Sequence, residues 1–187
     1  MQISQEHPLQ RLFHELVREQ FSRRAHVYDA DIAEYVSRVL VDFADVEHLY
    51  RIRNVQGRLL EDVAEMLVES NPLLNASSFD REREVRKHVG DFTLFFSGFF
   101  PELVAALPRV RWPSLDAVID YVKAGKESYA VVAAFNLFEY RAEAPLFRRL
   151  SEQFEQCVFG LNLVKHEIEE LQSGSQRRLR TDLGLES

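Results

Sequence analysis

The chain has 187 residues, of which 46% are apolar and 28% charged, and this balance is typical of one soluble globular domain. Its 30 acidic residues outnumber 23 lysines and arginines, and the formal net charge is −7. Nucleic acid is therefore not an expected partner, because phosphate binding needs clustered positive charge and the basic residues here are dispersed.

Membrane insertion and disulfide bonding are not expected either. The single cysteine, Cys157, excludes an internal disulfide and a zinc site of several thiolates. The first residues lack the pattern of a secretory signal, and the longest uncharged stretch, residues 128–138, is far shorter than the ~20 residues of a membrane-spanning helix. We expect a cytoplasmic protein without a membrane span.

Apolar residues recur at helical spacing along nearly the whole chain, and no stretch alternates for long with a period of two. This pattern predicts an all-α fold. We expect a single domain over residues 1–171, a bundle of six to eight helices around a phenylalanine-rich core, and then a flexible tail over residues 172–187.

The first helix is predicted from Pro8 to about Phe21, because proline suits the first turn of a helix. A second helix is expected to begin at Asp29 or Asp31, either of which can cap it. Its apolar seam continues in alternating steps of four and three as far as Tyr50, which predicts one long helix.

A short helix is predicted over residues 58–69, followed by an uncharged loop over residues 70–79. The next helix is expected from Asp80 to about Phe99, with an end or a kink at Gly98 and Pro101. A further helix is expected to open at Pro113.

The most apolar helix is predicted over residues 128–140, and it should be central because it needs neighbours on more than one side. The longest seam runs over residues 144–171 and predicts one long final helix. This helix either packs lengthwise in the bundle or also pairs with a second copy of the chain, as in a homodimer. Gly90 and Gly160 are expected where a neighbour approaches closely.

Five phenylalanines lie within nine residues, the densest aromatic segment of the chain: Phe92, Phe95, Phe96, Phe99 and Phe100. These rings form either the centre of the core or the wall of an apolar pocket. Nearby in the predicted fold, three polar residues interrupt apolar surroundings: Asn136, Asn162 and His166. If they face inward, they either fix helix register or provide polar groups in a pocket lined by Phe92, Phe96 and Phe99.

A metal site is a weaker hypothesis. Glu84, His88 and Asp91 share one stripe of a predicted helix, and Asp45 with His48 could complete a coordination shell. The alternative is that Glu84 faces solvent and that His88 is hydrogen-bonded to Asp91 or to a backbone carbonyl, and we favour it. Two Glu-x-x-His motifs, which di-iron bundles use, are absent.

The fingerprints of dinucleotide-binding, P-loop, serine-hydrolase and zincin proteins are also absent. No catalytic residue and no cofactor is identified. The sequence favours a non-catalytic helical protein that binds a hydrophobic small molecule or a protein partner. A metal- or cofactor-dependent enzyme built in a helical bundle is the alternative.

Overall fold

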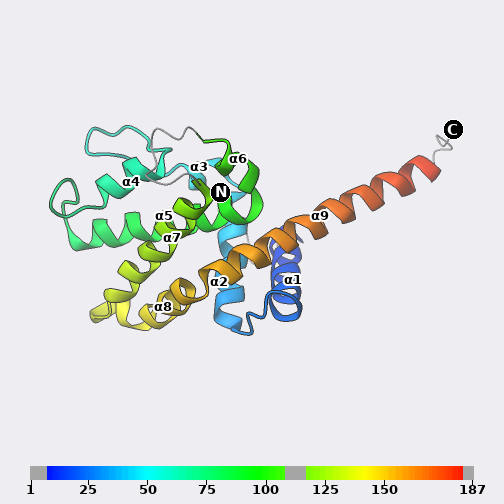
Figure 1. Ribbon diagram of the computed structural model, residues 1–187, viewed down its shortest axis with the longest axis horizontal. Coiled ribbons are helices and arrows are strands. Elements are labelled where there is room, and N and C mark those ends of the chain that lie inside the picture. The colour runs from blue at the N-terminus through cyan, green and yellow to red at the C-terminus, as the bar shows by residue number, and fades with distance from the viewer. Residues whose placement is uncertain (1–7, 108–116, 183–187) are drawn as a thin grey trace.

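The computed structural model describes residues 8–107 and 117–182, with side chains up to Ser175. Within these ranges it contains nine α-helices and no β-strand, which confirms the all-α prediction (Figure 1). The helices are α1 (Pro8–Arg23), α2 (Ala30–Phe43), α3 (Val46–Leu49), α4 (Val63–Glu69), α5 (Phe79–Phe99), α6 (Pro101–Ala105), α7 (Ala117–Ala134), α8 (Ala144–Glu152) and α9 (Phe154–Asp182), with a 3-10 helix, η2 (Phe138–Ala142), before α8. The helix start predicted at Pro113 lies outside the described residues. Across the described segments, no helix combines the length and the apolar character needed to cross a membrane.

Aspartate side chains fix where several helices begin. Asp29 accepts hydrogen bonds from two backbone amides of the first turn of α2, which confirms one of its two predicted caps. Asp45 caps α3 in the same way and so divides the continuous helix predicted as far as Tyr50. Asp62 caps α4, so this helix begins at residue 63. The predicted helix, over residues 58–69, began five residues too early. Apolar spacing continues through both caps, and for this reason the seam alone did not reveal them.

The core is centred on α5, which packs along α7 and is crossed by α9 (Figure 1). Glycines permit two close approaches, as predicted. A Cβ at Gly90 would lie 2.4 Å from the Tyr129 ring on α7, and a Cβ at Gly160 would lie 2.5 Å from the Phe21 ring on α1. The absence of these side chains lets the helix backbones meet large rings directly.

The single helix predicted over residues 144–171 is divided. At Gln153 the backbone leaves helical geometry (φ −106°, ψ 21°), and α9 starts one residue later. The predicted seam is nevertheless buried on both sides of this break, from Phe147 through Phe154 to Val164. The division preserves the phase of the seam, so periodicity could not expose it.

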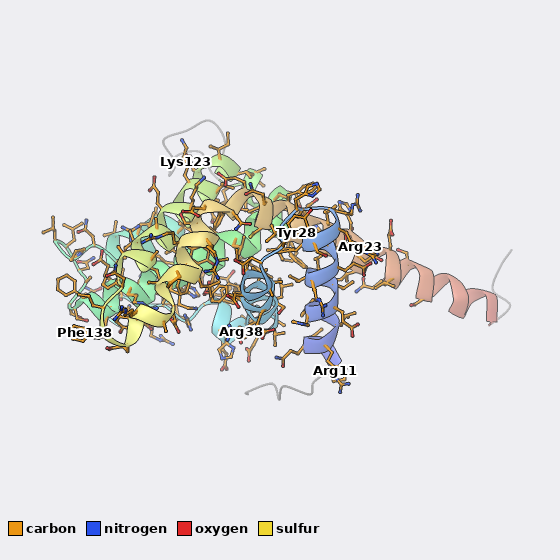
Figure 2. All side chains as sticks on the ribbon, turned by 90° about the horizontal axis from the view of Figure 1, so that it is seen from below. Arg11, Arg23, Tyr28, Arg38, Lys123 and Phe138 are labelled. Atoms are coloured by element: carbon orange, nitrogen blue, oxygen red, sulfur yellow. The ribbon has the colours of Figure 1, made fainter. Side chains whose placement is uncertain are left out.

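The helix predicted over residues 128–140 ends early. Its first part is central, since Tyr129 and Val132 are fully buried in α7. The helix stops at Ala134, and Phe138, which is 86% exposed, takes a left-handed backbone conformation (φ 52°). In Figure 2 this residue lies at one extreme of the molecule, opposite the projecting part of α9.

Candidate ligand-binding cavity

A cavity of about 430 Å³ lies between α2, α3 with the chain that follows it, α5 and the start of α8. This volume is within the range of small-molecule sites. Its apolar and aromatic lining consists of Tyr35, Val39, Phe43, Leu146 and Phe147. Its charged and polar lining consists of Arg38, Asp42, His48, Arg51, Lys87, Asp91 and Glu143.

Asp91 on α5 is the most densely bonded group of this cavity, and it is only 4% exposed. One carboxylate oxygen accepts hydrogen bonds from the hydroxyls of Tyr35 (2.5 Å) and Tyr129 (2.8 Å). The other accepts from the Lys87 ammonium at 3.0 Å. Three helices thus meet at one carboxylate, because Tyr35 belongs to α2 and Tyr129 to α7. Buried charge requires this degree of pairing.

The two tyrosines serve as hydrogen-bond donors. Burial, and then the negative charge of Asp91, raises the pKa of Tyr35 well above its ordinary value. The same two causes raise the pKa of Tyr129. Both hydroxyls therefore keep their protons and hold Asp91 in place, which rigidifies the wall of the cavity.

His88 lies on α5, three residues before Asp91, and is fully buried beside the cavity. Its Nδ1 accepts a hydrogen bond from Arg51 Nε at 3.2 Å, which requires an unprotonated Nδ1 and therefore a neutral ring. Burial, and then the adjacent Arg51 charge, lowers the pKa of His88 to about 4. A neutral imidazole thus anchors a guanidinium at the rim of the cavity.

Charges around the cavity are unequally paired. Lys87 neutralises Asp91. Glu143 forms an ion pair, 2.5 Å between nitrogen and oxygen, with Arg83, which does not line the cavity. The guanidinium of Arg51 makes no ion pair with a carboxylate in the part of the chain that the structure describes. Arg38, labelled on α2 in Figure 2, reaches its nearest carboxylate only at 3.9 Å. Asp42, which also lines the cavity, forms no ion pair among the described residues either, so the cavity carries two guanidinium groups and one unpaired carboxylate.

The predicted pocket requires Asn136, Asn162 and His166 to face inward. This placement is wrong for Asn136 and His166. Asn136 is exposed just after the end of α7, and His166 is exposed on α9. Asn162 is half-buried, with only a 3.5 Å contact from its amide to the carbonyl of Gly98. The physical reason is that α7 ends two residues before Asn136, so this residue never continues the buried face.

The predicted phenylalanine wall forms a different feature. Phe92 is buried, whereas Phe96 and Phe99 are half-buried. Phe92 and Phe96 lie 4.6 Å apart between ring centroids, and Phe99 stacks on Phe95 at 5.7 Å. These rings pack against one another along the end of α5, and none of them lines the 430 Å³ cavity. Their role as ligand contacts stays a prediction.

The five candidate metal ligands do not converge on one point, and each has a different partner or place in the structure. Glu84 is exposed and pairs with Arg81, Asp45 caps α3, and His48 lines the cavity. His88 is bonded to Arg51, and Asp91 to the tyrosines and the lysine, as described above. Over residues 8–107 and 117–175, no three His, Cys, Asp or Glu side chains gather closely enough to hold a metal ion.

Sequence reasoning missed Tyr35, Tyr129, Lys87 and Arg51. Tyr35 sits beside the apolar seam of α2, and Tyr129 lies in the longest uncharged stretch of the chain. The spacing of apolar residues does not distinguish either tyrosine from an ordinary core aromatic. A hydroxyl in such surroundings needs a polar partner, and Asp91, which interrupts a buried face of α5, is the nearest chemical match.

Comparisons of this chain with protein-family models, with curated proteins and with solved structures found no match. The function is therefore argued from the geometry of the cavity.

Proposed function

We propose that the protein is a binding protein for a small amphipathic anion, a molecule with an apolar body and a carboxylate or phosphate group. The cavity between α2, α5 and α8 is the binding site. The observation that carries this proposal is the combination of apolar walls with two guanidinium groups, those of Arg38 and Arg51, that lack a close carboxylate partner.

The apolar body of such a ligand would lie against Phe43, Leu146 and Phe147. Its anionic group would accept hydrogen bonds from the guanidinium groups, which suit carboxylate and phosphate geometry. Asp91 does not repel it strongly, because Lys87 already neutralises that carboxylate. The Asp42 carboxylate in the same lining opposes an anion, and the two guanidinium groups together outweigh its single charge. The same bonding leaves Asp91 poorly placed as a general base, which favours binding over catalysis.

The test is calorimetric titration with 2-naphthoate, naphthyl phosphate and decanoate, with neutral 2-naphthol as the comparison ligand. At least one anion is expected to bind at least about 10-fold more tightly than the neutral ligand, since a charged hydrogen bond contributes about 1.5–3 kcal/mol. Arg51→Gln or Arg38→Gln should remove most of that preference.

Arg18→Gln is the matched control, because it removes the same charge from α1, away from the cavity lining. It should leave every affinity unchanged. The proposal fails if no anion binds at about 1 mM, a concentration equivalent to only about 4 kcal/mol of binding free energy. It also fails if the cavity variants and Arg18→Gln behave alike.

A further inference from the structure

The second half of α9 projects from the body of the molecule as a single helix (Figure 1). From Glu169 to Ser175 the described residues are exposed, apart from the half-buried Gly174, and Leu171 is 49% exposed. A lone helix of this length is marginally stable in water, and glycine and serine in its middle weaken it further. Residues 169–175 of α9 thus lack the packing that stabilises the other long helices.

Charges on this segment are arranged in two blocks of opposite sign. The acidic block is Glu167, Glu169 and Glu170, and the basic block is Arg177, Arg178 and Arg180. Residues 167–180 contain no charged residue besides these six. The two blocks are symmetric about the point midway between residues 173 and 174. Position 167 mirrors position 180, position 169 mirrors 178, and position 170 mirrors 177.

The two blocks do not reach each other within one helix. Glu170 and Arg177, their nearest members, are separated by about 10 Å along the helix axis at a rise of 1.5 Å per residue. Ion pairs within a helix form between residues three or four apart. A second copy of the helix, lying antiparallel and centred on the same point, places each acidic block at the level of a basic block. A parallel copy would oppose like charges.

The centre of this pattern is narrow. Ser173, Gly174 and Ser175 are consecutive, and each residue of an α-helix is turned by 100° from the one before. These three small residues therefore cover most of the circumference of the helix at this level. A Cβ at Gly174 would meet no atom within 4 Å, whereas Gly90, Gly98, Gly125 and Gly160 all adjoin a neighbour. Among the residues that the structure describes, no contact accounts for a glycine at this position.

We propose that the protein forms a homodimer through antiparallel pairing of the projecting parts of α9, centred between Ser173 and Gly174. The overlap of residues 167–180 spans about 21 Å, with the two bodies at opposite ends. A two-helix contact of this length is small for a stable interface, and much of it is electrostatic. The dimer therefore forms with a dissociation constant of about 10–100 µM and weakens as salt is added.

Sedimentation of the full chain at about 100 µM and about 20 mM salt should show a dimer that dissociates at about 500 mM salt. Two variants reverse one block each: E167R/E169R/E170R and R177E/R178E/R180E. Each alone should be monomeric, with self-association weakened at least 10-fold. An equimolar mixture should restore the dimer, because an all-basic helix then meets an all-acidic one. Circular dichroism checks that both variants remain folded.

Orientation is tested with a spin label at Gln156→Cys, an exposed position on the part of α9 within the body. The native Cys157 is fully buried and does not compete for the label. Antiparallel pairing places the two labels about 52 Å apart along the helix axis, whereas parallel pairing places them side by side. A monomer at about 100 µM, a dimer insensitive to both reversals, or a short label distance would each overturn the proposal.

Discussion

His88 is expected to make the fold sensitive to acid. The side chain is fully buried as a neutral imidazole, with Arg51 on one side and Lys87 and Asp91 close on α5. Below the ordinary histidine pKa of about 6.5 the unfolded chain binds a proton at this residue. The folded protein does not do so until the pH approaches its lowered pKa of about 4. In this window the unfolded state binds more protons, and stability falls as the pH is lowered.

The magnitude follows from the difference between the two pKa values. Each pKa unit corresponds to about 1.36 kcal/mol, so the full penalty is about 3 kcal/mol, of which about 2.5 kcal/mol develops between pH 7 and pH 4.5. His88→Gln removes the titration. Its amide oxygen can still accept from Arg51 Nε, and its amide group cannot be charged.

Urea unfolding followed by circular dichroism at several pH values measures the effect. The free energy of unfolding of the wild type should fall by about 2.5 kcal/mol more than that of His88→Gln between pH 7 and pH 4.5. His166→Gln is the control, since the His166 side chain is 66% exposed. It should keep the wild-type slope. Equal slopes for wild type and His88→Gln would refute the reasoning.

Three further predictions concern the core. Asp91→Ala leaves two buried tyrosine hydroxyls without their acceptor and should cost about 3–5 kcal/mol in urea unfolding, whereas Asp91→Asn, which keeps an acceptor, should cost less. Gly125→Ala places a Cβ 2.2 Å from the Phe154 ring, and a loss of about 1–3 kcal/mol is expected; an unchanged midpoint would contradict this packing. Burial raises the pKa of Cys157 to about 12, so a thiol reagent should label it only on unfolding, and rapid native labelling would show otherwise.

The fold class could be predicted because helical periodicity is a property of neighbouring residues. The seams of α2, α5 and α9 were visible in the spacing of apolar residues, and the close approaches at Gly90 and Gly160 were indicated by glycines placed inside predicted helices. Helix breaks were less visible. Asp45 and Gln153 interrupt helices without shifting the phase of the seam, and only the backbone geometry distinguishes them.

The cavity could not be predicted because its parts are far apart in the sequence. Tyr35 and Asp91 are separated by 56 positions, and Tyr129 and Asp91 by 38. Spacing within one helix gives the face on which a residue lies and leaves open which helix covers that face. Asp91 was accordingly grouped with Glu84, its neighbour on the same stripe, although Glu84 is exposed and pairs with Arg81.

Polar residues within apolar stretches therefore need two facts before they indicate a site. The first is that the helix continues through them, which fails for Asn136 because α7 ends at Ala134. The second is that a complementary group faces them from another helix, which holds for Tyr35 and Tyr129 around Asp91. Since a buried hydroxyl is costly without a partner, tyrosines in apolar seams are the residues whose partners should be sought first. In this chain that search leads to Asp91, and through it to the cavity.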